Sequence, residues 1–312
     1  MIIKSTAPCR ISLFGGSTDI PQYADKYGGL VISFATNLRS KLTLYTEEAS
    51  SILNRVPLKG DMNFMRKIFS HFKLEKVKFV SESEALLESG LGTSAASAVA
   101  TVGAINRVLK LNTGKGEIAE KAWEIETKVI GLYGGRQDQY ASAFGGFNAI
   151  MFSKDRIDVQ PLKTKMITQL MPALVLVHTN KIRTNPKIQE GFKKLDSERI
   201  AKLSELKDLA TSAFVSLEEG DIEAVGALLD QSWQVKKQTN KGISTPELDN
   251  IYQNAKHYGA YGGKLLGSGG GGYMLFIVDP NKRDEFVEKI VKEGVSFWDM
   301  SVDWNGVETR VL

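Results

Sequence analysis

A run of small residues from Gly90 to Ala104 constrains the fold of this chain more than any other stretch. It begins with two glycines around Leu91, continues with the hydroxyl residues Thr93 and Ser94, and then carries almost no bulky side chain. Glycine permits a positive φ and lets another group approach the main chain closely. Thr93 or Ser94 can serve as the N-cap of the helix that follows, whose free N–H groups then point out of the loop. The stretch predicts an anion site, with phosphate the usual ligand; the alternative is a loop that only begins a buried helix.

The composition indicates a globular protein with two domains. A length of 312 residues is more than one hydrophobic core usually serves, and 42% hydrophobic with 24% charged residues is ordinary. The formal charge of +4 is small and spread along the chain, which favours anionic small molecules over nucleic acid as partners. The single Cys9 excludes an internal disulfide and indicates a reducing cytoplasm, and no apolar run reaches the length that spans a membrane. Three scattered histidines argue against a zinc site of the HExxH type.

The order of the expected elements indicates an α+β fold, because strands and helices follow one another without regular βαβ alternation. The segment around residues 163–172 is interpreted as the junction between the two domains. Hydrophobic periodicity predicts strands at 2–5, 10–14, 30–35, 41–46, 77–80, 147–152, 156–162, 173–178, 273–278 and 306–312. It predicts helices at 20–26, 61–72, 94–109, 115–129, 186–217, 221–238 and 283–293, and one that begins at Pro246 with Thr245 as its cap.

A second glycine loop follows the strand that carries Arg10. It reads Gly15-Gly16-Ser17-Thr18-Asp19, and glycines at a strand end followed by polar residues are typical of a binding loop that leads into a helix. Asp19 offers a carboxylate to the hydroxyls of a polyol. The loop is therefore a candidate substrate site, with Gly16, Ser17 and Thr18 beside that carboxylate.

Asp138 is the best candidate for a general base. It follows the pair Gly134-Gly135 and lies beside Arg136 in a run that is otherwise poor in carboxylates. A carboxylate placed to take a proton from a substrate hydroxyl contributes roughly two to four decades in rate. An aspartate at the start of a helix is often only an N-cap, so that alternative stays open.

Glu126 lies twelve positions before Asp138 on an amphipathic helix. Together with the Ser94 hydroxyl it makes a candidate Mg²⁺ site, because Mg²⁺ takes few protein oxygens and keeps phosphates and water as its other ligands. A solvated helix carboxylate is the alternative.

Two further features lie in the second half of the chain. The consecutive glycines Gly269, Gly270, Gly271 and Gly272 cost backbone entropy that a plain turn does not need, so we interpret them as a second wall of the site; a flexible hinge is the alternative. They match G-x-G-x-x-G but precede a strand, which excludes a dinucleotide fingerprint. Lys181 and Arg183 follow a buried strand and could clamp a phosphate, or could be solvated loop charges.

Taken together, these motifs resemble the GHMP kinase superfamily, named for galactokinase, homoserine kinase, mevalonate kinase and phosphomevalonate kinase. The signature Pro-x-x-x-Gly-Leu-Gly-Ser-Ser-Ala is met by Gly90–Ala95, with Leu86 in place of the proline and Thr93 in place of the first serine. The third family motif is matched by Lys264–Gly272. Within the superfamily the chain is similar to heptose kinases that act on D-glycero-D-manno-heptose 7-phosphate, through the runs 7–21, 137–146 and 263–272.

The resemblance implies a fold and a nucleotide site. Residues 1–165 would form a domain like ribosomal protein S5 domain 2, and residues 166–312 a ferredoxin-like domain across a cleft. Gly90, Leu91, Gly92, Thr93, Ser94, Ala95 and Ala96 would wrap the phosphates of ATP. Ser94 with Glu126 would hold Mg²⁺, and Asp138 would be the catalytic carboxylate, as a full base or mainly as a stabiliser of the transition state. Arg10 would neutralise the transferring phosphoryl group.

The resemblance also implies a substrate and a reaction. Asp19 would hold sugar hydroxyls, Lys181 with Arg183 would bind a distal phosphate, and the glycine wall would lie close to the substrate. The expected reaction is phosphorylation of the anomeric C1 hydroxyl of heptose 7-phosphate to the 1,7-bisphosphate. A GHMP kinase for another sugar, such as fucose or a galactose-like hexose, is the first alternative, and a non-catalytic sensor of nucleotide and sugar is the second. The anomer and the oligomeric state, monomer or homodimer, stay open.

Overall fold

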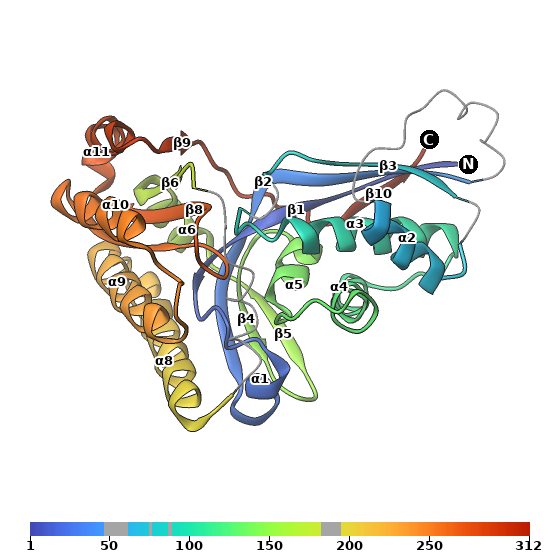
Figure 1. Cartoon of the computed structure of the whole chain (residues 1–312), viewed down its shortest axis with the longest axis horizontal. Helices are drawn as coiled ribbons and strands as arrows, with labels where there is room; N and C mark the ends of the chain where they lie inside the picture. Colours follow the sequence, from blue (N-terminus) through green and yellow to red (C-terminus); the bar gives the residue numbers. More distant parts are fainter. Residues whose placement is uncertain (47–61, 75–76, 87–88, 182–194) are drawn as a thin grey trace.

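The computed structural model describes residues 1–46, 62–74, 77–86, 89–181 and 195–312, and it contains two antiparallel sheets with helices packed on them (Figure 1). The first sheet has the order β10-β1-β2-β4-β5, with β3 paired to β2 outside this path. Its strands are β1 (Ile2–Phe14), β2 (Gly29–Tyr45), β3 (Lys78–Ser83), β4 (Phe147–Phe152), β5 (Ile157–Pro161) and β10 (Glu308–Val311). The second sheet has the order β7-β8-β6-β9, formed by β6 (Leu174–His178), β7 (Ala260–Leu265), β8 (Tyr273–Val278) and β9 (Ser296–Trp298). The expected α+β class is confirmed.

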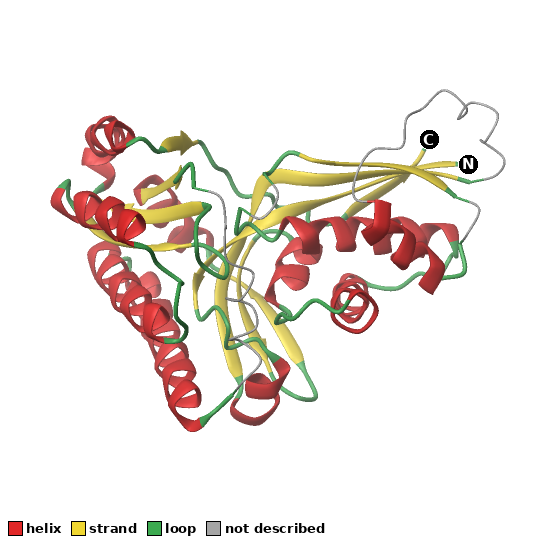
Figure 2. Cartoon of the chain, in the orientation of Figure 1, coloured by secondary structure: helices red, strands yellow, loops and turns green. Residues whose placement is uncertain are grey.

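The helices separate into a group on the first sheet and a group gathered around the second sheet (Figure 2). The first group consists of α1 (Pro21–Tyr27), α2 (Met62–His71), α3 (Thr93–Val108), α4 (Lys115–Glu124) with a π-helical turn at Ile125–Ile130, and α5 (Gln137–Phe144). The second consists of α6 (Thr164–Leu170), α8 (Ser197–Glu219), α9 (Ile222–Gln238), α10 (Pro246–His257) and α11 (Arg283–Ile290), with 3₁₀ turns at Met171–Ala173, Pro280–Lys282 and Val291–Glu293. In the first group α3 packs on β1 and β2. In the second group α9 packs on β7 and β8, whereas α8 packs on α9 and on β1 and β2 of the first sheet. In the described part of the chain, no helix combines the length and apolar character needed to cross a membrane.

The prediction of four short strands in the first 46 residues was wrong, because β1 and β2 are each continuous. The strands predicted at 2–5 and 10–14 left a gap at Pro8, yet Pro8 lies inside β1 at a register shift, where Pro8 faces Arg39 and Arg10 faces Ala35. Proline lacks the N–H that a regular ladder requires, so a bulge is where a strand can accommodate it. The bulge therefore bends one strand and does not end it, and it carries Arg10 into the site.

The small residues of α3 are explained by close packing on the sheet. A Cβ atom added at Gly103 would lie 3.0 Å from Ser5 Oγ in β1 and 3.0 Å from Thr309 Oγ1 in β10. Those two hydroxyl groups are hydrogen-bonded to each other at 2.9 Å. The prediction that something packs very close to this backbone is confirmed for Gly103, and the close neighbour there is the protein's own sheet.

One apolar core joins the two sheets. It contains Phe14 and Ile32 from the first sheet, Leu275 from the second, Ala210 from α8 and Leu229 from α9, all fully buried. The chain passes from the first sheet to the second through α6, within the expected junction, and returns with β10, which pairs with β1. The domain boundary near residue 165 stays a prediction. The strand β10 lies after this boundary in the sequence but belongs to the first sheet.

The remaining helix predictions differ from the structure mainly at the ends. The helix expected at 186–217 is α8, which ends at Glu219 and begins, within the described residues, at Ser197. The helix expected at 115–129 ends as α4 at Glu124 and continues as the π-helical turn. Thr245 is the N-cap of α10, as predicted, and its hydroxyl accepts from Leu248 N at 3.4 Å. The strands β7 and β9 had no prediction.

Candidate active site

The loop before α3 has the conformation that its glycines allow. Gly90 has a φ of 90° and Gly92 a φ of 72°, and Gly92 is the N-cap of the helix without a side-chain capping bond. The prediction of Thr93 or Ser94 as the N-cap was therefore wrong. The left-handed Gly92 begins the helix one residue earlier, and both hydroxyls bond elsewhere: Thr93 Oγ1 donates to Leu86 O at 3.3 Å and Ser94 Oγ donates to Glu126. With no side chain capping it, the first turn of α3 suits an anion.

Residues from both halves of the chain contact this loop. Arg10 N donates to Leu91 O at 2.8 Å, and Arg10 Nη1 donates to Gly90 O at 2.5 Å. On the opposite side, a Cβ atom at Gly90 would lie 2.5 Å from the carbonyl oxygen of Leu266, which follows β7. Only glycine fits between these neighbours at a positive φ, so β1 and the end of β7 together determine the position of the loop.

The glycine run after β7 packs against the protein itself. A Cβ atom at Gly269 would lie 2.7 Å from Ile243 Cα, and one at Gly272 would clash with Ser89 O. Tyr273 N donates to the same Ser89 oxygen at 3.1 Å. These contacts explain Gly269 and Gly272 without a ligand and place the run beside the Gly90 loop. A contact of Gly269, Gly270 or Gly271 with substrate stays a prediction.

Arg10 and Asp138 form a two-pronged ion pair at this loop. Arg10 Nε donates to Asp138 Oδ1 at 2.7 Å and Arg10 Nη2 donates to Oδ2 at 2.8 Å. The Arg10 side chain is 7% exposed and that of Asp138 is 27% exposed, so the carboxylate is the accessible member. A Cβ atom at Gly92 would lie 3.2 Å from Asp138 Oδ2. Asp138 is in the first turn of α5, whose N-cap is Arg136, so it is not the N-cap that the alternative supposed.

Ser94 and Glu126 are in direct contact, as the candidate Mg²⁺ site requires. Ser94 Oγ donates to Glu126 Oε1, and Gln139 Nε2 donates to Glu126 Oε2 at 2.6 Å. Glu126 lies in the π-helical turn after α4 and is buried, and this burial raises its pKa to about 7 although the two hydrogen bonds act to lower it. A hydroxyl and a carboxylate oxygen side by side at the phosphate loop suit Mg²⁺. Gln139 was not among the predicted site residues.

Asp19 anchors the second glycine loop to α5. Its Oδ2 accepts from Gln137 N at 2.9 Å, and its Oδ1 accepts from Gln137 Nε2 at 2.8 Å and from Ser17 N at 3.1 Å. The carboxylate is buried, which raises its pKa. Gly135 is a glycine because a Cβ atom there would clash with Asp19. Asp19 thus connects this loop with the residue before Asp138, and its contact with sugar hydroxyls stays a prediction.

Three cations that the sequence interpretation did not assign lie in the same part of the molecule. Lys236 Nζ from α9 donates to Ser17 Oγ at 2.8 Å, and Lys264 Nζ from β7 donates to Leu13 O at 2.9 Å. Arg199 from α8 is buried, as are both lysines. Burial, together with the charges of Lys236 and Arg10, lowers the pKa of Lys264 to about 7. Lys264 belongs to the third motif and could have been proposed from it, whereas Lys236 carries no local signal.

The predicted phosphate clamp is not part of this cluster. Lys181 is exposed and lines a shallow pocket with Pro246, Glu247 and Glu293, and it makes no hydrogen bond to Asp19 or Asp138. Its main-chain carbonyl accepts from Gly272 N at 3.2 Å. Arg183 lies outside the described residues.

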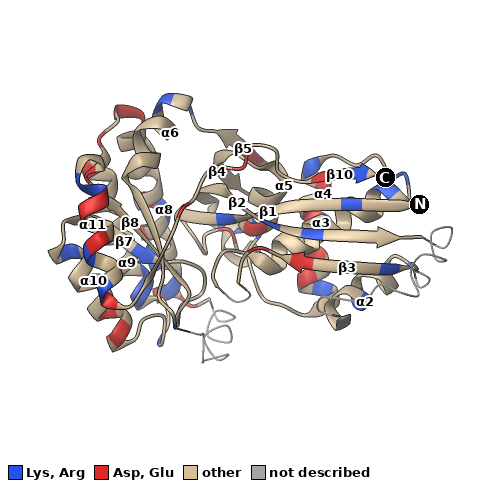
Figure 3. Ribbon diagram, turned by 90° about the horizontal axis from the view of Figure 1, so that it is seen from above, with Lys and Arg blue, Asp and Glu red and all other residues tan. Residues whose placement is uncertain are grey.

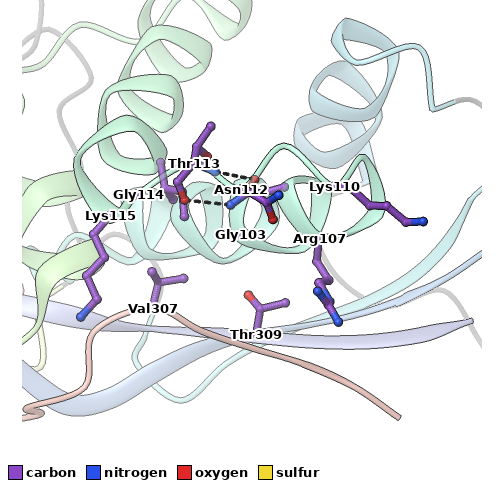
Figure 4. Close-up of a pocket in the computed structure, with 11 residues that line it drawn as sticks. Gly103, Arg107, Lys110, Asn112, Thr113, Gly114, Lys115, Val307 and Thr309 are labelled. Atoms are coloured by element: carbon purple, nitrogen blue, oxygen red, sulfur yellow. Dashed lines mark hydrogen bonds between the residues drawn. The ribbon is translucent and has the colours of Figure 1, made fainter.

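The pocket between α3, α4 and β10 contains none of the predicted site residues (Figure 4). Arg107, Lys110 and Lys115 give it a basic lining. Lys115 Nζ donates to the carbonyl oxygens of Phe144 at 3.1 Å and Asn305 at 2.8 Å, so it serves to join α4 to the segment before β10.

Comparison with known proteins identifies the family. Residues 60–146 match the model of the GHMP kinases N-terminal domain, and residues 213–296 match that of the GHMP kinases C-terminal domain. The chain is 33% identical over 333 residues to D-glycero-alpha-D-manno-heptose 7-phosphate kinase of Campylobacter jejuni, covering 98% of each protein. A crystal structure of a D-glycero-D-manno-heptose 1-phosphate kinase from Bacteroides thetaiotaomicron superimposes with a TM-score of 0.79 at 26% identity, covering 99% of each chain. The galactokinase of Lactococcus lactis, at 20% identity and a TM-score of 0.74, shares the fold and covers 100% of this chain and 95% of its own.

A glycine loop at a helix N-terminus, next to an accessible carboxylate paired with an arginine, suits a phosphotransferase. The chain belongs to the GHMP kinase family. The predictions of a kinase and of this family are confirmed, and kinases of this family take the phosphoryl group from ATP.

Proposed function

We propose that this kinase acts on a sugar, and that it phosphorylates the anomeric C1 hydroxyl of D-glycero-D-manno-heptose 7-phosphate to give the 1,7-bisphosphate. The observation that carries the proposal is the Arg10–Asp138 pair, whose accessible carboxylate lies against Gly92 of the phosphate loop. The similarity to a heptose 7-phosphate kinase over nearly the whole chain supports the choice of sugar.

The chemistry follows from these positions. The sugar hydroxyl oxygen attacks the γ-phosphorus of ATP, the bond from that phosphorus to the β-phosphate oxygen breaks and ADP leaves, and the hydroxyl proton departs on the side that Asp138 faces. Arg10 holds the carboxylate with two hydrogen bonds and places positive charge beside the phosphoryl group in transfer. The main chain of Gly90–Ala96, at the positive end of α3, binds the phosphates of ATP. Asp138 either accepts this proton fully or mainly stabilises the charge that develops in the transition state.

Ser94 and Glu126 would hold Mg²⁺, which when bound neutralises charge on the nucleotide phosphates. Gln139 orients the Glu126 carboxylate through its 2.6 Å hydrogen bond and is the supporting residue of this site.

Ser94→Ala and Glu126→Gln are expected to raise the Mg²⁺ concentration for half-maximal activity by roughly tenfold or more, because each removes an oxygen ligand. A magnesium titration of initial rates at saturating ATP measures this. Ser97→Ala, one turn further along α3 and bonded to Ser40, and Glu124→Gln, paired with Lys121 and Lys128, are the matched controls. Unchanged titrations in the first two variants would return both residues to a purely structural role.

ADP release from a panel of acceptors tests the proposed function. The panel contains heptose 7-phosphate, the same heptose without phosphate, fucose and galactose. The proposal expects the highest kcat/KM with heptose 7-phosphate. Preference for an unphosphorylated sugar would favour the alternative of another sugar kinase, and binding of nucleotide and sugar without ADP release would favour a sensor.

The proposal also includes the setting of the enzyme. The buried free thiol of Cys9 fits a reducing cytoplasm, and the partners are ATP and a small sugar phosphate, with neither nucleic acid nor a membrane required. The number of subunits stays open.

A further inference from the structure

The loop at Ser17 is hydrogen-bonded by one lysine from the second half of the chain. Lys236 Nζ from α9 donates to Ser17 Oγ at 2.8 Å, across 219 positions of sequence. Ser17 has a φ of 81°, which is unfavourable for a residue other than glycine. Ser17 N and Gln137, the residue before Asp138, bond the same Asp19 carboxylate. Lys236 is therefore connected to the Arg10–Asp138 pair through one short loop. Basic residues are drawn in blue at the end of α9 in Figure 3.

The charge around Lys264 favours an anion there. Lys264 is 7% exposed, and its ammonium donates to the carbonyl oxygen of Leu13, which is a neutral acceptor. Its pKa is lowered first by burial and then by the positive charges of Lys236 and Arg10. Arg10 already pairs with Asp138 through both carboxylate oxygens. Burying an ammonium next to other cations costs free energy, unless a negative group lies close to it. A phosphate dianion supplies that negative charge.

A tyrosine hydroxyl marks the same region. Among the residues that the structure describes, Tyr133 Oη is shut off from solvent and has no hydrogen-bond partner. Burial raises the pKa of Tyr133, the charge of Arg199 opposes this rise and the charge of Asp19 adds to it. A buried hydroxyl without a partner costs free energy, which a ligand oxygen would recover.

We propose that Lys236 and Lys264, with Arg199 and the Tyr133 hydroxyl, form the subsite for the distal phosphate of the sugar. This inference rests on the proposed function, because it assigns a place to one part of that substrate. It differs from the expectation of Lys181 and Arg183. Lys181 is exposed and shares its pocket with Glu247 and Glu293, whose negative charges oppose a dianion, whereas the cations near Ser17 are buried.

Kinetics with two acceptors test the assignment. Lys236→Met is expected to raise KM for heptose 7-phosphate by roughly 10- to 100-fold, the usual effect of losing a hydrogen bond to a charged group. With the same heptose lacking the phosphate, kcat/KM should change by less than about threefold, since no phosphate contact is lost. Lys264→Met should show the same pattern as Lys236→Met: a higher KM for heptose 7-phosphate and little change in kcat/KM for the heptose without phosphate. Lys237→Met is the matched control, because that neighbour pairs with Asp249 at 3.3 Å and lies over the Trp233 ring.

Equal losses with both acceptors would overturn the assignment, and so would a selective loss in Lys181→Ala with none in Lys236→Met. Calorimetric titration of inorganic phosphate into protein saturated with Mg²⁺ and a non-hydrolysable ATP analogue gives a readout without turnover. Phosphate binding in the unmodified protein that is lost in Lys236→Met supports the subsite, even if the acceptor panel contradicts the proposed function. If the unmodified protein phosphorylates heptose 7-phosphate efficiently and Lys236→Met and Lys264→Met do so equally well, the proposed function stands and the subsite is overturned.

Discussion

Asp138→Asn is expected to lower kcat by roughly two to four orders of magnitude while nucleotide affinity stays within a few fold. The side chain keeps its size but loses the charge that accepts a proton and that pairs with Arg10. The nucleotide loop is also held from elsewhere, because Gly90 packs against Leu266 and Tyr273 N bonds Ser89 O. Steady-state kinetics and a fluorescent-nucleotide titration measure the two quantities separately.

The control for this variant is Glu120→Gln. Glu120 lies in α4, contacts Arg136 and Tyr140 of the same region, and does not bond Arg10. Removing the partner of a buried arginine costs about 3–5 kcal/mol of stability, so thermal melts must show that Asp138→Asn is folded at the assay temperature. Turnover near that of the control in a folded Asp138→Asn protein would remove Asp138 from the mechanism.

Gly90→Ala is expected to destabilise the protein by about 3–5 kcal/mol and to weaken nucleotide binding, whereas Gly131→Ala costs only about 1–2 kcal/mol. Both glycines have a φ of 90°, so an alanine at either position adopts a positive φ. They differ in space: a Cβ atom at Gly90 would lie 2.5 Å from Leu266 O, while Gly131 has nothing within 4 Å. The difference between the variants therefore isolates the contact between the phosphate loop and β7.

Urea denaturation of both variants measures the difference in the free energy of unfolding. The same fluorescent-nucleotide titration reports whether the displaced loop still binds. Equal destabilisation of the two variants would mean that Leu266 moves aside without cost. In that case the end of β7 does not determine the position of the loop.

The candidate site divides into parts that were visible in the sequence and parts that were not. The phosphate loop, the candidate base Asp138 and the pairing of Ser94 with Glu126 were predicted, and the two side chains of that pair are in contact. The N-cap of α3 was assigned to the wrong residue. The prediction relied on the capping preference of Thr and Ser, whereas the chain enters the helix through Gly92 in the left-handed conformation. The gap predicted at Pro8 was also wrong, because a bulge within a strand accommodates a residue without an N–H as well as a strand end does.

Long-range contacts account for the rest. Arg10 and Asp138 are 128 positions apart, and Lys236 and Ser17 are 219 apart. No local pattern distinguishes Lys236 from Lys237, its neighbour on α9, although one bonds the Ser17 loop and the other pairs with Asp249. The packing of α9 on β7 and β8, and the core shared by the two sheets, decide which lysine faces the site.

The sequence by itself therefore determined the family, the α+β class and the chemistry of each loop, because glycine conformation, helix starts and side-chain type depend on residues that are close along the chain. Only the tertiary structure decided that β10 returns to β1, that Arg10 binds both carboxylate oxygens of Asp138, and that the buried Lys236 and Lys264 bond Ser17 and Leu13. These features depend on how the two sheets pack against each other through a shared apolar core. The free energy of that packing is summed over residues far apart in the sequence, so no single stretch of the chain carries it.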